Sequence, residues 1–128
     1  MATKLNSKGS AHAGKLVTAG KITKGDTWDP ASPNSENKYI KENGISEWGK
    51  FFLGIDTDVP LDTKEHYKYP YSNDWKTIHR KGIIAAKTRA AQQGAIDIEN
   101  RADSLLKKID GKTKASFFDI NGEINFFG

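Results

Sequence analysis

The sequence predicts an α+β fold, with a small helical domain, a short central hairpin and a C-terminal β-hairpin. In the middle of the chain, apolar residues spaced by three and four positions indicate one buried helical face: Ile45, Trp48, Phe52 and Ile55. Shortly after them, alternating tyrosines indicate a strand: Tyr67, Tyr69 and Tyr71. Near the end, Asn121-Gly122 separates two strand-like runs, which favours a type I′ turn between paired strands.

Composition restricts the classes of protein to consider. A chain of 128 residues suits one domain. Its residues are 36% hydrophobic and 28% charged, which is a rather polar composition, so we expect part of the chain to lie outside the core. The absence of cysteine excludes disulfides, thiolate catalysis and cysteine zinc sites. No apolar run reaches the ~18 residues of a membrane span, and the N-terminus lacks the apolar stretch of a signal peptide. We therefore expect synthesis in the cytoplasm and no membrane partner.

The first part of the chain divides into two predicted segments. Residues 1–20 form an N-terminal tail with a short helix at 7–18, because small and apolar residues there precede Gly20, a helix stop. Residues 21–40 are rich in Gly, Pro, Ser, Asn and Asp, which favour turns. We predict an irregular connector in which Trp28 provides the anchor to the core.

Residues 41–111 form the predicted helical core domain. Its main helix lies within residues 43–56, where Gly54 supplies a plausible helix end. A hairpin follows, with Tyr67, Tyr69 and Tyr71 on one arm and Trp75, Thr77 and His79 on the other, although Pro70 weakens the first arm. Helix-forming residues then run from Gly82 to Gly94, and a second helix ends at Gly111. With so short a break between them, these two helices should pack as a helical hairpin.

Residues 112–128 form the predicted C-terminal β-hairpin, or the start of a further domain. Aromatic residues crowd this segment although chain ends are typically polar: Phe117, Phe118, Phe126 and Phe127. We predict that these phenylalanines bind a partner, because an exposed apolar hairpin can add strands to a partner sheet.

No catalytic, cofactor or metal site is predicted, and the chain is not expected to be an enzyme. Its histidines, His12, His66 and His79, lack metal-ligand spacing. The DTDVPLD loop has carboxylates but lacks the later glycine and glutamate of a calcium loop. Nucleotide-binding glycine motifs and a nucleophile elbow are also missing.

One group of basic residues is a candidate nucleic-acid site. It lies among the tyrosines and Trp75, and cations with exposed aromatic rings can hold phosphates and stack bases: Lys68, Arg80, Lys81, Lys87 and Arg89. The net charge of +4 also favours an anionic partner. The alternative is that the aromatic rings form the core while the basic side chains are solvated.

Three segments carry a family resemblance: WGKFFLG, HYKYPY and the pattern R-x-G-[IL]-x-A-x-x-x-R-A at residues 80–90. Together with HAGKLVTAGKI and TWD upstream, they resemble a module of tailed-phage head genes, over roughly residues 7–110. Such modules lie beside, or are fused to, head maturation proteases. The ending GEINFFG is similar to the opening strand region of ClpP-like proteases encoded with some phage heads.

The resemblance implies a structural component or assembly factor of a phage head, made in the bacterial cytoplasm and located in the virion head. Its expected partner is the major capsid protein or another head protein, with an oligomeric state set by the assembly and packaged DNA as a further partner. Two alternatives stay open. The chain is a nucleic-acid-binding accessory of the head, or it is the N-terminal, non-catalytic part of a head protease precursor.

Overall fold

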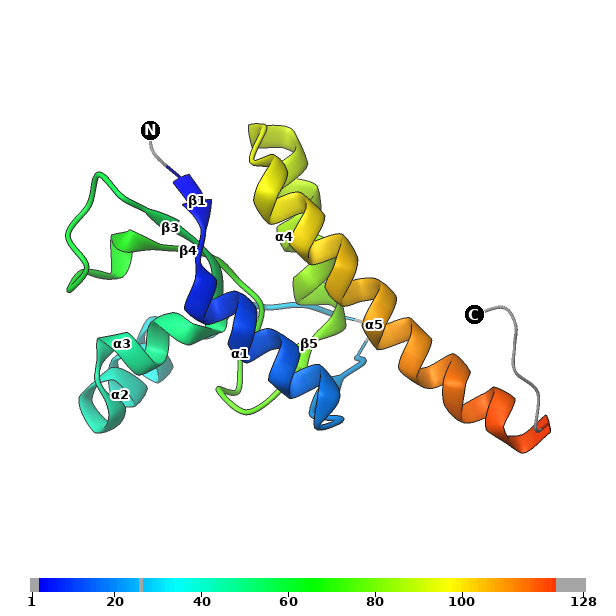
Figure 1. Cartoon of the computed structure of the whole chain (residues 1–128). Coiled ribbons are helices and arrows are strands. Elements are labelled where there is room, and N and C mark those ends of the chain that lie inside the picture. Colours follow the sequence, from blue (N-terminus) through cyan, green and yellow to red (C-terminus); the bar gives the residue numbers. More distant parts are fainter. Residues whose placement is uncertain (1–2, 26, 122–128) are drawn as a thin grey trace.

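The chain forms an α+β domain, as predicted. The structure is a computed structural model that describes residues 3–25 and 27–121, with side chains described as far as Gly111. The described residues contain five α-helices, a three-stranded antiparallel sheet that α1, α4 and α5 contact, and two further short strands that pair in parallel (Figure 1). Its buried core combines aromatic side chains at the sheet with aliphatic side chains from the helices.

Helix α1 (Ser7–Thr18) has the bounds that the sequence predicts. It turns Gly9, Ala13, Leu16 and Val17 into the core and leaves its basic residues outside. The helix ends where predicted, because Gly20 takes the left-handed backbone conformation at φ 75°.

The main sheet has the strand order β1 (Thr3–Leu5), β3 (Phe52–Asp56) and β4 (Tyr67–Pro70). Leu5 lies opposite Gly54, and Gly54 lies opposite Lys68 in the other ladder. Because β3 is the middle strand, both of its edges are hydrogen-bonded. Strands β3 and β4 form the central hairpin of the fold, but from different residues than predicted.

The predicted helix at 43–56 is wrong in its second half. Helix α3 (Ile45–Trp48) passes into a 3-10 turn at Gly49–Phe51, and β3 follows. The apolar spacing fits a helix, but Phe51, Phe52 and Leu53 are all buried in succession. Consecutive buried residues suit a central strand, and the pairing on both sides of β3 overrides the local pattern.

The predicted pairing of the tyrosine arm with Trp75 to His79 is also wrong. Strand β4 pairs with β3, whereas β5 (Ile78–His79) pairs in parallel with β2 (Ile22–Thr23). The intervening loop is organised by the Asp74 carboxylate, which accepts backbone hydrogen bonds from Lys76 and Thr77 at 2.9 Å each. That loop does not close a two-stranded hairpin.

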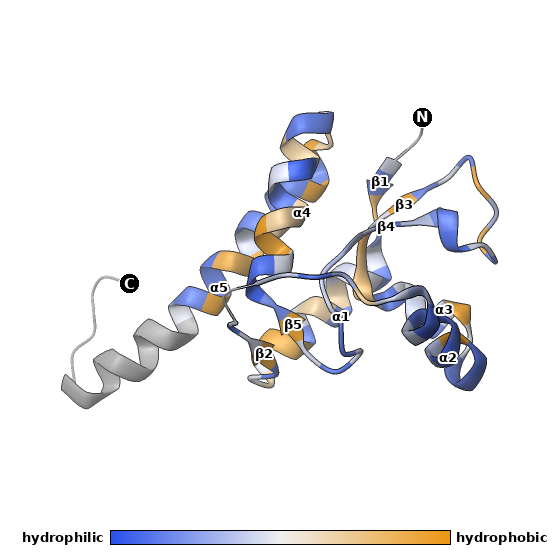
Figure 2. Cartoon of the chain, turned by 180° about the vertical axis from the view of Figure 1, so that it is seen from behind, coloured by the Kyte–Doolittle hydropathy of each residue, from blue (hydrophilic) through white to orange (hydrophobic). Residues whose placement is uncertain are grey.

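The predicted connector is only partly irregular. Helix α2 (Pro33–Asn43) begins inside it, with the Ser32 hydroxyl accepting from the backbone of Ser35 and Pro33 in the first turn. No residue of α2 is fully buried, and the helix is largely hydrophilic (Figure 2). Trp28 is the anchor that the sequence predicts, because its ring packs over Gly82 and edge-on against His79.

The predicted helical hairpin is present. Helix α4 (Arg80–Gln93) ends at Gly94, which is left-handed at φ 73°, and α5 (Ile96–Asn121) packs against it. The stripe on α5 is buried at Ile98, Ala102, Leu105 and Ile109, and partly buried at Leu106.

The predicted C-terminal β-hairpin is wrong over residues 112–121, which continue α5 through Asn121. Extending a helix that has already formed is easier than nucleating a new element, and an isolated two-stranded hairpin is marginal in water. Gly111 does not stop the helix, since it lacks a left-handed φ. Residues 122–128, including Gly122 of the expected turn, lie outside the described part of the chain.

Candidate functional site

The five basic residues predicted to bind nucleic acid separate into two pairs and one isolated residue, Lys81. Arg80 and Lys87 on α4 form ion pairs with α5: Arg80 Nε lies 2.9 Å from Asp110, and Lys87 Nζ lies 2.8 Å from Asp103. The pKa of the Asp103 carboxyl is lowered by hydrogen bonds from Lys87 and Lys107. These two ion pairs link α4 to α5, and each cation already has an aspartate as its partner.

Lys68 and Arg89, in contrast, line one pocket of about 510 Å³. Strand β4 contributes Lys68, Tyr69 and Pro70, and the connector contributes Trp28 and Pro30. Helix α4 contributes Arg89 with Ala85, Ala86 and Gln93, and Thr3 of β1 completes the lining. Lys81 is exposed on α4 outside this pocket.

Small side chains create the space in this pocket. Ala85 and Ala86 have nothing beyond Cβ, so a hollow remains between α4 and β4. Gly82 lets the Trp28 ring pack closely on α4 beside the pocket, because a Cβ at this position would lie only 2.9 Å from the indole ring. The position of the tryptophan at the pocket therefore requires a glycine on α4.

Tyr69 has an unusual backbone conformation for a residue that lines the pocket. Its φ of 62° is left-handed, a conformation that costs a residue other than glycine about 1–3 kcal/mol. The ring packs against Gly54, where an added Cβ would approach to 2.6 Å, and the hydroxyl donates a hydrogen bond to Gln93 Oε1. Tertiary packing thus keeps Tyr69 in a strained conformation beside the two cations.

The pocket is electrostatically positive. None of its lining residues is acidic, and neither Lys68 nor Arg89 forms an ion pair with a described residue. Burial raises the pKa of Tyr69, while Arg89 lowers it by a smaller amount and the Asp97 carboxylate, outside the lining, adds a further small rise, so its hydroxyl remains a neutral donor near pH 7. The arrangement suits a ligand that has both an anionic group and a flat or apolar part.

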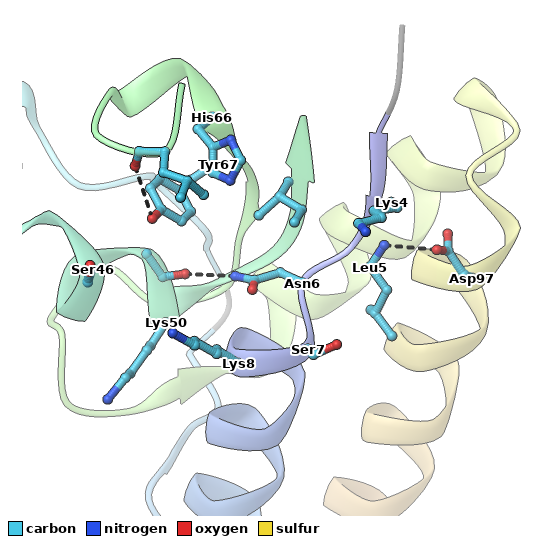
Figure 3. Close-up of a pocket in the computed structure, with 13 residues that line it drawn as sticks. Lys4, Leu5, Asn6, Ser7, Lys8, Ser46, Lys50, His66, Tyr67 and Asp97 are labelled. Carbon is cyan, nitrogen blue, oxygen red and sulfur yellow. Dashed lines mark hydrogen bonds between the residues drawn. The ribbon is translucent and has the colours of Figure 1, made fainter. Parts of the chain in front are cut away.

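A second pocket, of about 450 Å³, lies at the start of α1 (Figure 3). Its polar groups mainly join the elements around it. The Asn6 side-chain amide donates to the carbonyls of Gly49 and Phe52 at 3.0 Å each, and the Leu5 N–H donates to Asp97 at 2.8 Å. Lys50, which also lines it, pairs with Glu47 at 2.9 Å. These contacts join α1 and β1 to the sheet and to α5.

The histidines are placed in packing and capping roles. His66 is buried and its Nδ1 lies 2.8 Å from the Val59 carbonyl, while His79 accepts a hydrogen bond from the Lys81 backbone at the start of α4. His12 packs edge-on against Phe51, and burial lowers its pKa. In the described residues, no group of three or more His, Asp or Glu side chains is arranged to hold a metal ion.

The DTDVPLD loop is described by the structure, whereas the terminal phenylalanines are described only in part. Asp56 accepts from the backbone of Asp58 at 3.0 Å, which is a loop contact within the turn after β3. Phe117 and Phe118 lie on the helical backbone of α5, and their side chains are outside the described part. Phe126 and Phe127 lie outside the described residues altogether.

Sequence reasoning did not place Trp28, Gln93 or the two alanines in a site. Trp28 stands out as a lone tryptophan in a polar connector, which is the signal that indicates a contact to the body of the protein. The alanines give no such signal, because alanine is an ordinary helix former.

Comparison of the chain with models of protein families, with curated proteins and with solved structures finds no match. Over its described residues, no helix has the combined length and apolar character that crossing a membrane requires. Fold and site together define a small α+β module with a positively charged, aromatic pocket.

Proposed function

We propose that the chain is a non-enzymatic structural component or assembly factor of a tailed bacteriophage head, and that it binds a head protein through the C-terminal part of α5 and the residues after it. The resemblance of WGKFFLG, HYKYPY and residues 80–90 to a phage head-gene module supports this assignment. The capsid protein is the proposed partner.

The length of α5 is the observation that carries the proposal. Helix α5 has 26 residues and α4 has 14, which correspond to about 39 Å and about 21 Å. Arg80, the first residue of α4, pairs with Asp110. The turns of α5 after Asp110 therefore have no residue of α4 opposite them, and they lead into the phenylalanine-rich end of the sequence.

A helical arm changes the expected mode of binding. The sequence alone favours strand addition by a hairpin, but residues 112–121 are helical. A helix binds a partner by placing apolar residues in a groove. We therefore propose a helix-in-groove contact in which Phe117 and Phe118 are the main apolar residues.

Co-sedimentation with heads assembled from the cognate capsid protein tests this proposal. The full chain is expected to sediment with heads, whereas Phe117→Ala/Phe118→Ala and a chain ending at residue 111 remain in the supernatant. Lys112→Ala/Lys114→Ala is the matched control, because alanine keeps helix propensity at neighbouring positions of the same helix. Equal retention of the phenylalanine variant and the control would contradict the proposal.

A further inference from the structure

We infer that the pocket between Trp28, Lys68 and Arg89 binds a nucleotide unit of single-stranded nucleic acid. In this arrangement the phosphate lies between the two cations, and the base lies against the tryptophan. The inference does not depend on the role in the head, because it rests on a different surface from the C-terminal part of α5.

The charges of the pocket point to an anion. Arg80 and Lys87 on α4 are each matched by an aspartate of α5, whereas Arg89 on the same helix has no acidic partner among the described residues. Lys68 faces the same pocket from β4 and is likewise unmatched there. Two cations from different elements that line one pocket, with no acidic residue in its lining, fit a phosphate group.

The remaining lining points to a flat ring beside that anion. Trp28 is held on one side by Gly82 and His79, and it also lines the pocket. Bases stack on aromatic side chains without regard to sequence, and this contact is typical of single-strand binding. Because Gln93 accepts from Tyr69 through Oε1, its amide NH₂ group is left to donate to a base edge.

The size of the pocket favours one nucleotide unit. A volume of about 510 Å³ lies within the range of about 300–1,000 Å³ typical of small-molecule sites. A base in a duplex is stacked between its neighbours and is not available to enter such a space, whereas a single strand presents unstacked bases. We therefore expect single strands to bind more tightly than duplexes of the same length.

The experiment uses fluorescence anisotropy of the full chain with a labelled 12-nucleotide single strand. Unlabelled competitors are the matching duplex, a deoxynucleoside monophosphate, inorganic phosphate and a glutamate-rich peptide. We expect competition by the monophosphate and weaker competition by the duplex and by inorganic phosphate. Competition by the peptide that equals or exceeds that of the nucleotide would overturn the assignment to nucleic acid.

Two variants and one control distinguish binding in the pocket from general electrostatic attraction to the protein. Lys68→Ala/Arg89→Ala is expected to weaken binding by about tenfold or more and to flatten the salt dependence. Ala85→Leu keeps the charge but narrows the pocket from an exposed helix position, so it should also weaken binding. Lys41→Ala/Lys108→Ala removes the same net charge from exposed positions outside the pocket and should change affinity by less than about threefold.

Thermal unfolding of each variant provides the check on folding. If the double variant in the pocket and the control double variant weaken binding equally while both remain folded, the protein attracts nucleic acid by its overall charge and the pocket is not the site. Absence of single-strand binding by the full chain at low salt would also overturn the inference. Weakening by Ala85→Leu without a change in unfolding midpoint would support it directly.

Discussion

Replacing Gly9 by alanine tests how closely α1 packs on the sheet. An alanine Cβ at this position would lie 1.8 Å from the Phe52 carbonyl oxygen and 2.8 Å from the Asn6 amide nitrogen. The same Asn6 amide donates to Phe52 at 3.0 Å and to Gly49 at 3.0 Å. The backbone of β3 is fixed by pairing on both sides, so α1 has to move outward to relieve the contact.

Two opposing effects set the magnitude of this change. Alanine is favoured over glycine in a helix by about 1 kcal/mol, so propensity alone predicts stabilisation. Overpacking of a tight core costs about 1–3 kcal/mol, and breaking the buried Asn6 hydrogen bond costs about 1–3 kcal/mol more. The expected net effect of Gly9→Ala is a free energy of unfolding that is lower by about 1–5 kcal/mol, and at the middle of this range the thermal midpoint is lower by roughly 10 °C.

Urea unfolding followed by tryptophan fluorescence measures this change, because Trp48 is only 1% exposed in the folded chain. Gly14→Ala is the matched control in the same helix. Its Cβ would meet only the end of the Arg101 side chain, at 3.0 Å, so relief of this contact requires a shift of a few tenths of an ångström in a side chain and none in the backbone of the sheet. If Gly9→Ala proved as stable as Gly14→Ala, the described contact between α1 and β3 would be refuted.

Three further changes are followed by the same unfolding assay. Gly111→Ala should stabilise the protein by up to about 1 kcal/mol, because α5 continues through this position and, among the described residues outside the local helix backbone, no atom lies within 4 Å of the added Cβ. Destabilisation would indicate that the helix stops there. Tyr71→Phe should cost about 1–2 kcal/mol, because it removes the hydroxyl that donates to the Lys50 carbonyl at 2.6 Å, and an unchanged midpoint would argue against that bond. Burial tends to raise the pKa of Asp74, but hydrogen bonds from the backbone N–H groups and the hydroxyls around it lower the pKa below 3.8 overall. Its ionised form therefore stabilises the fold above about pH 4, and this contribution is lost as the pH falls through the lowered pKa. Asp74→Asn should reduce stability at pH 7 and have progressively less effect below pH 4, so a difference that does not depend on pH would contradict this account.

The helices that sequence predicted best are those with local signals at both ends. Helix α1 lies between Asn6 and the left-handed Gly20, and α4 ends at the left-handed Gly94. Helix α2 was missed because Pro33 and the serines around it also favour turns. In the structure Ser32 accepts the capping hydrogen bond and Pro33 lies in the first turn, so the same residues start a helix.

The strands were predicted poorly because their partners are far away in sequence. Phe52 and its neighbours have helical spacing, yet β3 pairs with residues near position 4 and near position 68. Pairing of this kind depends on contacts that no local window contains. At the C-terminal end the error has the opposite cause, since the local signal at Asn121-Gly122 favours a turn between strands, whereas the helix that begins at Ile96 continues through Asn121.

The candidate site was predicted in part, and the spacing of charges explains which part. Arg80 and Lys87 are seven residues apart on α4, as are Asp103 and Asp110 on α5, so two antiparallel helices bring both pairs together two turns apart. Arg89 follows Lys87 by two residues, which turns it by about 200° around the helix, away from α5. That rotation directs Arg89 to the pocket that contains Lys68. The spacing of charges in the sequence therefore determines which cations pair with aspartates and which can bind a ligand. The two kinds can be told apart only when the pairing of the two helices is known.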